Sequence, residues 1–238
     1  MVTALALCSC AKNNNPDSLG SVQSGVTAPA PKTVLIYNGQ GSCGQTCADS
    51  TSQLVTAAGL TPKVVTSDLL SGLTSSSMIS TLFQDAVALI LPGGAATSIL
   101  AGMSPMLMNE ILSFIQGGGG YAGFDAGALI STALVGNTNV PGLGIFPGQI
   151  LTSSSGGIGT IFGDLISGNL VKLFTDVLGP VITGFGNLAN PVGRYSNNTV
   201  AAATTTFGAG KVFVSGTQPT TSSGQDIATN MIKWVSNL

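Results

Sequence analysis

The chain has 238 residues, of which 7% are charged, and its net charge is −2 with no His at all. So few cations cannot form the basic surface that a nucleic-acid backbone requires, and we expect no nucleic-acid partner. The absence of His removes every Ser-His or Cys-His mechanism and the commonest transition-metal ligand, so we expect no metal and no cofactor.

The N-terminal segment, residues 1–31, has the composition of a lipoprotein signal end followed by a flexible linker. A short apolar run leads into Leu7-Cys8-Ser9-Cys10, with Leu three places and a small residue one place ahead of Cys10. We therefore expect Cys10 to be the lipidation site, with Cys8 as the second choice, although no charged region precedes the run. An ordinary N-terminal tail is the alternative. The prediction is a protein of the bacterial cell envelope that meets the membrane only through a lipid anchor.

From residue 33 onward, apolar runs and amphipathic stretches alternate at intervals that suit strand, helix and strand, which predicts a parallel sheet covered on both faces. The expected strands are 33–38, 63–66, 86–91, 144–146, 149–152, 200–205 and 211–215, together with a short strand that meets a turn within 121–128. The expected helices are 48–58, 76–83, 106–116, 129–134 and 225–235. Residues 158–188 suit either a short helix pair or a loop insertion. One α/β domain over residues 32–238 is the prediction.

Two cysteines, Cys43 and Cys47, stand four residues apart in a Gly-rich loop after the first expected strand. In an oxidising envelope they would form a local disulfide that pins the loop, whereas in the cytosol they would be two thiols or a metal site short of ligands. The disulfide is the prediction. A nucleophilic role is not expected, because no His is present to lower the pKa of either thiol.

Five motifs follow one another in a fixed order. They are Tyr37-Asn38-Gly39-Gln40-Gly41, Leu91-Pro92-Gly93-Gly94, the run 117–128 that contains Phe124-Asp125-Ala126-Gly127-Ala128, Leu143-Gly144-Ile145-Phe146-Pro147-Gly148 and Gly210-Lys211-Val212-Phe213-Val214-Ser215-Gly216. In this order they resemble the class I glutamine amidotransferase-like superfamily, and within it the biotin-protein ligase N-terminal family. The resemblance implies an α/β fold, a flavodoxin-like three-layer sandwich with a mostly parallel central sheet.

The catalytic positions of that family are changed in this chain. At the turn between strand and helix, called the elbow, the family carries a nucleophilic Cys and this sequence has Asp125. The positions that match the family's catalytic His and Glu hold Gln218 and Thr220. A carboxylate facing an amide cannot perform thiolate chemistry, so the resemblance implies a pseudoenzyme.

The elbow would project Asp125 above the sheet edge, where it could bind a ligand, act as a general base or nucleophile, or simply accept hydrogen bonds from its own turn. In the family, the turn at Gly93 and Gly94 supplies N–H groups that stabilise an oxyanion. Further expected ligand contacts are Tyr37, Gly39 and Gln218, near carboxyl ends of expected strands. Tyr37 could equally be a packed aromatic and Gln218 a loop amide.

Three functions remain open from the sequence. The first is a noncatalytic, amidotransferase-like envelope lipoprotein that binds a small polar ligand or an envelope protein. The alternative is a hydrolase-type enzyme that uses Asp125 as general base or nucleophile. The third is a purely structural surface protein, which the low charge and the Gly, Ser and Thr content favour.

Overall fold

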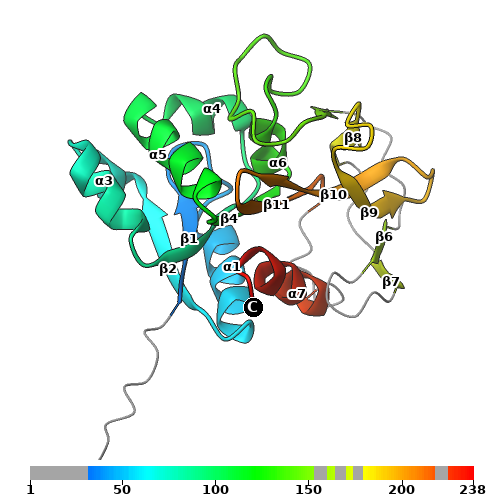
Figure 1. The fold of residues 1–238 in the computed structure, drawn as a ribbon, viewed down its shortest axis with the longest axis horizontal. Helices are drawn as coiled ribbons and strands as arrows, with labels where there is room; N and C mark the ends of the chain where they lie inside the picture. The colour runs from blue at the N-terminus through cyan, green and yellow to red at the C-terminus, as the bar shows by residue number, and fades with distance from the viewer. Residues whose placement is uncertain (1–31, 153–159, 164–169, 174–178, 218–224) are drawn as a thin grey trace, which may run out of the picture. The chain divides into compact units, whose positions relative to one another are not determined.

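Parallel strands form one side of the sheet, as the apolar runs predict (Figure 1). They are β1 (Thr33–Asn38), β2 (Thr61–Thr66), β3 (Ala86–Leu91), β4 (Gly120–Phe124) and β11 (Gly210–Ser215). They lie in the order β2-β1-β3-β4-β11, and each neighbouring pair is parallel. Because parallel strands need crossover connections, helices cover both faces, and the middle residues of β1 and the last four of β3 are apolar and buried.

The computed structural model describes residues 32–152, 160–163, 170–173, 179–217 and 225–238. Cys10, Gln218 and Thr220 lie outside these ranges, so the predicted lipidation site and two of the changed catalytic positions have no structural account. Within the described ranges, every helix is too short or too polar to cross a membrane.

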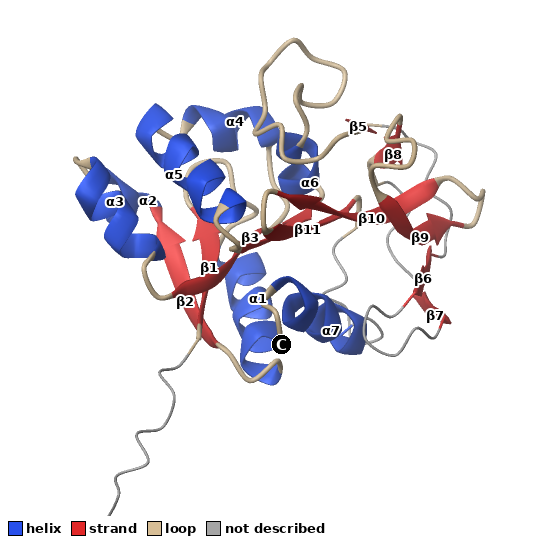
Figure 2. Ribbon diagram, viewed as in Figure 1, coloured by secondary structure: helices blue, strands red, loops and turns tan. Residues whose placement is uncertain are grey.

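Two helical layers cover the sheet, one on each face (Figure 2). On one face lie α1 (Gln45–Ala57) and α7 (Gln225–Val235), and on the other lie α3 (Ser76–Phe83), α4 (Ala96–Ala101), α5 (Pro105–Gln116) and α6 (Ala126–Ser131). Side chains of a strand alternate between faces. Val34 and Ile36 of β1 therefore pack with α1 and α7, while Leu35 and Tyr37 pack with the other layer.

Helix α5 shows how these layers are held. It begins after Ser104, whose Oγ accepts a hydrogen bond from the Leu107 N–H at 3.1 Å, and it buries Leu107, Ile111 and Ile115 at four-residue spacing. Each buried aliphatic side chain contributes about 2 kcal/mol. The short helices α2 (Ser67–Ser71) and α4 were not predicted from the sequence. Each has less than two turns, which is too short for a helical periodicity of apolar residues to be recognised.

An antiparallel extension continues the sheet beyond β11. Strand β10 (Val200–Phe207) pairs with β11, and β9 (Asn190–Tyr195), β6 (Thr160–Gly163) and β7 (Leu170–Leu173) follow in that order, while β8 (Val181–Thr183) joins β10 to β5 (Gln149–Leu151). All of these pairs are antiparallel. The described parts of 158–188, left open between a helix pair and a loop, thus contain strands.

One expected strand, residues 144–146, is wrong. The backbone N–H groups of Leu143, Gly144 and Ile145 donate to the carbonyls of Ile130, Thr132 and Ser131 at 2.7, 3.1 and 2.9 Å. These carbonyls belong to the C-terminal end of α6, which has no further turn to satisfy them. The segment caps a helix instead of joining the sheet, and α6 ends at Ser131 instead of continuing to residue 134.

Candidate functional site

Asp125 occupies the turn between β4 and α6, with φ 49° and ψ −106°. A positive φ is costly for a residue with a side chain, and such strain persists only where the surroundings enforce it. The Asp125 N–H donates to the Ser215 carbonyl of β11 at 2.8 Å, and the Asp125 carbonyl accepts from the Leu129 N–H of α6 at 3.0 Å. The predicted strand-turn-helix elbow is therefore present and is tied to two neighbouring elements.

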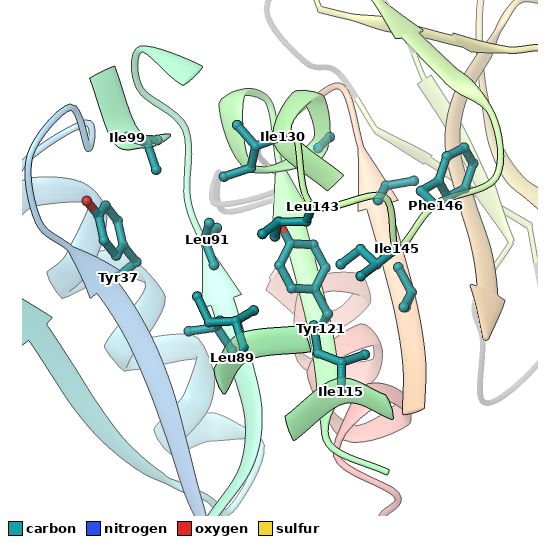
Figure 3. Packing of buried hydrophobic residues seen from close by; sticks show 14 of the residues in the cluster. Tyr37, Leu89, Leu91, Ile99, Ile115, Tyr121, Ile130, Leu143, Ile145 and Phe146 are labelled. Carbon is teal, nitrogen blue, oxygen red and sulfur yellow. The ribbon is translucent and has the colours of Figure 1, made fainter. Parts of the chain in front are cut away.

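Glycines on either side of Asp125 allow the elbow to pack tightly. A Cβ on Gly123 would meet the Gly127 carbonyl, and a Cβ on Gly127 would run into the Leu91 carbonyl of β3. The Tyr121 hydroxyl donates to the Gly127 carbonyl at 2.6 Å from beneath the turn. Burial raises the pKa of Tyr121, so this hydroxyl keeps its proton and remains a donor. Figure 3 shows Tyr121 standing among Leu91, Leu143 and Ile145.

The half-buried carboxylate of Asp125 accepts hydrogen bonds from the backbone N–H groups of Gly94 and Ala126. The structure thus brings together Asp125 and the turn at Gly93 and Gly94, two of the motifs that the sequence places far apart. Burial raises the pKa of Asp125, and the two N–H groups oppose that rise without cancelling it. The Asp125 carboxyl is thus held by one N–H group of its own elbow and by one of the Gly93–Gly94 turn.

The loop after β1 runs along the Gly93–Gly94 turn. The Cys43 N–H donates to the Gly93 carbonyl at 2.9 Å, the Ala95 N–H donates to the Gly41 carbonyl at 2.8 Å, and Ser42 forms a β-bridge with Gly94. Gly94 has φ 145°, and a Cβ there would overlap the Gly41 carbonyl. A glycine is therefore required for this pairing.

A disulfide joins Cys43 to Cys47, in agreement with the sequence-based prediction. Because Cys47 lies in the first turn of α1, the bridge fastens the loop to a helix that packs on the sheet. Its effect on the site is indirect: it holds Ser42 and Cys43 against the turn whose Gly94 N–H contacts Asp125.

A chain of polar side chains leads away from this loop. The Ser42 hydroxyl donates to Asn38 Oδ1 at 2.9 Å, and Asn38 Nδ2 donates to Gln45 Oε1 at 3.1 Å. Gln45 Nε2 in turn donates to Asp49 Oδ1 at 2.6 Å. Asn38 and Ser42 were not singled out by the sequence analysis, although their place after a strand that ends in a Gly loop could have indicated them.

Tyr195 is a site residue that sequence reasoning missed. It lies on β9, is 2% exposed and donates its hydroxyl proton to the Pro180 carbonyl at 2.9 Å. Burial raises the pKa of Tyr195, and the negative charge of Asp125 raises it further. No pattern in the sequence links residues 70 positions apart across an antiparallel extension, so only the tertiary structure could reveal this pair.

Tyr37 lies in the core, and the packed-aromatic alternative is the one that the structure shows. The side chain is 3% exposed, its hydroxyl donates to the Gln40 carbonyl at 3.0 Å, and burial raises its pKa to about 12. Gly39 leaves room for this ring, since a Cβ there would meet the Tyr37 hydroxyl. Of the two alternatives for Tyr37, the structure shows the packed aromatic, among the core residues of Figure 3.

Charged partners and metal ligands are also missing around the elbow as far as the structure describes it. None of the described Lys or Arg side chains pairs with Asp125, whose pKa responds only to burial and to the two N–H groups. The described residues contain no cluster of Cys, Asp or Glu that could hold a metal ion. The site offers one carboxylate, backbone donors and hydroxyl groups.

Comparison with known proteins finds a family likeness over the first half of the domain. Residues 32–139 match the family model described as "Biotin-protein ligase, N terminal". The match runs from β1 to just beyond α6 and so includes the Gly loop, the Gly93–Gly94 turn and the elbow. No curated protein sequence matches the chain.

Solved structures with the same fold are distant in sequence. A cytoplasmic protein from Salmonella typhimurium has a TM-score of 0.60 at 13% identity, over 86% of this chain and 98% of that one. A proposed GMP synthase component from Thermoplasma acidophilum has a TM-score of 0.56 at 15% identity, over 86% and 94%. A β-galactosidase from Rahnella sp. R3 has a TM-score of 0.56 at 14% identity, over 87% of this chain but 31% of that enzyme. These likenesses show a flavodoxin-like α/β fold.

Proposed function

We propose that residues 32–238 form a noncatalytic, amidotransferase-like domain that binds a small polar ligand or an envelope protein at the elbow, carried by a bacterial lipoprotein. The observation that carries this proposal is the hydrogen bonding of the Asp125 carboxylate to the Gly94 and Ala126 N–H groups. In acyl-transfer enzymes, such paired N–H groups stabilise the oxyanion of the transition state. In this chain, the Asp125 carboxylate accepts the hydrogen bonds of the Gly94 and Ala126 N–H groups.

The residue types support the absence of thiol chemistry. The two cysteines near the elbow are joined in a disulfide, and the chain contains no His to accept a proton from a nucleophile. A hydroxyl or carboxylate nucleophile without such a base is weak. The domain therefore retains the framework of a catalytic site without the groups that break bonds.

Binding is what the remaining groups can do. Asp125 is half-buried and without an ion-pair partner among the described residues, and buried charge is stabilised by donors. A ligand or protein loop that donates hydrogen bonds would complete the carboxylate's coordination. Ser42 pairs with Gly94 of the turn, and its hydroxyl would add a polar contact. Tyr195, whose pKa the negative charge of Asp125 raises, would add a second hydroxyl.

The test is a binding screen with an isosteric variant. The Tm is measured for wild type, Asp125→Asn and a control, Asp85→Asn, in the presence of methylammonium, glycinamide, L-glutamine or glycerol. The control changes an exposed carboxylate before β3. We expect at least one compound to raise the Tm of wild type and Asp85→Asn but not of Asp125→Asn. Ammonia release from L-glutamine by wild type should equal the rate without protein. Glutamine turnover that Asp125→Asn abolishes would overturn the proposal.

A hydrolase that uses Asp125 as general base is the second candidate, because a strained elbow and a carboxyl of raised pKa are features of catalytic bases. Hydrolysis of p-nitrophenyl acetate separates the two functions. We expect wild type and Asp125→Asn to give the same slow rate. A loss of about 10²-fold or more in Asp125→Asn would instead establish base catalysis.

The lipoprotein part of the proposal rests on the residues around Cys10 and is tested separately. A bacterial host that expresses the full chain behind a charged n-region is grown with an alkyne-labelled palmitate. We expect label in wild type and in Cys8→Ser but none in Cys10→Ser. Label that depends on Cys8 would move the attachment site, and an unlabelled wild type would remove the lipid anchor from the proposal.

A further inference from the structure

A hollow lies at the carboxyl edge of β1 and β2, and none of the elbow residues lines it. It is a cavity of about 400 Å³. Its walls come from the loop after β1, which contributes Gln40, from α2 with Ser67 and Leu70, and from α3 and α5. Ligands of open α/β sheets gather at this edge, and small-molecule sites have volumes of roughly 300–1,000 Å³.

The floor of the cavity is apolar. Ile79 and Leu107 line it and belong to the core, with 1% and 5% of their surfaces exposed, and Leu70 packs against the same core. Met106 of α5 also lines the cavity and is 41% exposed. Contact with a ligand would remove this apolar surface from water, which favours binding.

Free hydrogen-bonding groups stand above this floor. Within the described residues, the Gln40 amide and the Ser67 hydroxyl have no hydrogen-bond partner, and both line the cavity. Ser104 Oγ accepts from the Leu107 N–H, which leaves its own O–H to donate. Donors and acceptors of a neutral kind are therefore available to one polar group of a ligand.

Charge is the property that the cavity wall lacks. All the side chains that line it in the described part of the chain are uncharged. A charged group that entered would lose hydration and find no counter-ion, whereas a hydroxyl or amide would exchange water for Gln40 and Ser67. We propose that this cavity binds an uncharged small molecule that combines an apolar chain or ring with one hydroxyl or amide group.

Methyl NMR of the full chain tests both the place and the chemical class. The protein is labelled with ¹³C-methyl Met and titrated in parallel with 1-octanol, octanoate and octylammonium. These three compounds share an alkyl chain and differ in charge. We expect 1-octanol to shift the Met106 methyl saturably and to leave Met231, which is 1% exposed in the opposite layer, unmoved. Octanoate and octylammonium should bind at least about tenfold more weakly, since neither charge finds a partner.

Matched tryptophan variants locate the site. Ser71→Trp places a ring in the cavity and should abolish the saturable Met106 shift, whereas Ser80→Trp, at an exposed position of α3 outside the cavity wall, should retain it. If Ser71→Trp does not fold, Gln40→Ala replaces it and should weaken octanol binding severalfold. Equal binding of the charged analogues, equal shifts of Met106 and Met231, or no shift of Met106 would each overturn the proposal.

Discussion

Asp125 shows how a single residue can be held in a costly conformation by its neighbours. Backbone hydrogen bonds to Ser215 of β11 and to Leu129 of α6 hold its φ at 49°. Its carboxylate accepts hydrogen bonds from the Gly94 and Ala126 N–H groups. The same N–H groups that favour the charged form are outweighed by burial, which favours the neutral form. The balance at this residue can be measured through the dependence of stability on pH.

Because its pKa is raised on folding, Asp125 binds its proton more tightly in the folded chain than in the unfolded chain, where the value is near 3.8. Its contribution to stability is therefore complete below about 3.8 and is lost as the pH rises through the folded pKa. Asp125→Asn has no such loss. In urea unfolding between pH 3.5 and pH 7.5, the stability of Asp125→Asn relative to wild type should rise with pH. A constant or falling difference would contradict the raised pKa.

Gly127 is one of the glycines at which a methyl group has almost no room. Its Cβ would strike the Leu91 backbone carbonyl in the middle of the sheet, which cannot move aside. We expect Gly127→Ala to lower the free energy of unfolding by about 3 kcal/mol. The control is Gly72→Ala at the end of α2, where the nearest atom is 3.5 Å away and the backbone is helical. That variant should be neutral or stabilising by about 0.5 kcal/mol. Similar losses in both variants would show that the elbow is not tightly packed.

At the scale of elements, the loop between β1 and α1 has no buried side-chain anchor and depends on backbone pairing with the Gly93–Gly94 turn and on the disulfide. A bridge that closes so short a loop stabilises the folded chain by about 2 kcal/mol in the chain-entropy treatment. The loop connects the elbow, through Gly94, to the polar side chains of Asn38 and Ser42. Its order should therefore follow the state of the disulfide.

Removal of the bridge tests this dependence. Cys43→Ser/Cys47→Ser, made in a Cys8→Ser/Cys10→Ser background, should lose about 2 kcal/mol of stability relative to that background. The backbone N–H groups at positions 43 and 95 pair with the carbonyls of Gly93 and Gly41. Their hydrogen exchange should accelerate in the variant by a larger factor than the exchange of the N–H groups of β3. Unchanged exchange at these two positions would show that the backbone pairing alone orders the loop.

Local patterns predicted the elements that depend on local physics. β1, β3, α3 and α7 have the predicted bounds, because their apolar periodicity and their Pro, Gly or capping residues lie within a few positions of one another. Residues 144–146 read as a strand from their composition alone. Their N–H groups donate hydrogen bonds to carbonyls at the end of α6. The local sequence pattern gives no sign of these bonds, because the partners lie more than ten residues away.

At the scale of the whole molecule, residues 32–139, which match the family model, pack against elements that lie outside this range. β11 lies beside β4 and supplies the Ser215 carbonyl that fixes Asp125, and α7 packs on α1. Both elements come from the last 30 residues of the chain. Without them β4 becomes an exposed edge strand and one face of the sheet is partly uncovered.

A fragment of residues 32–139 should therefore not fold alone, whereas residues 32–238 should melt cooperatively with the Tm of the full chain. Far-UV circular dichroism and thermal unfolding of both fragments check this. The longer fragment is the control for removal of the N-terminal segment. A cooperative transition in the 32–139 fragment would show that the C-terminal strands and α7 are dispensable for the fold.

The sequence by itself determined the α/β class, the parallel strands from β1 to β4, the elbow and the disulfide, because each depends on residues that are close together in the chain. It also determined that no His can take part. The tertiary structure decided what surrounds the expected site residues: it joined the Asp125 carboxyl to the Gly94 N–H and let the charge of Asp125 act on Tyr195. It also placed Tyr37 in the core and formed the uncharged cavity that Gln40 lines. These outcomes depend on which strands become neighbours and which face each side chain takes, and such long-range contacts leave no local signal in a single sequence.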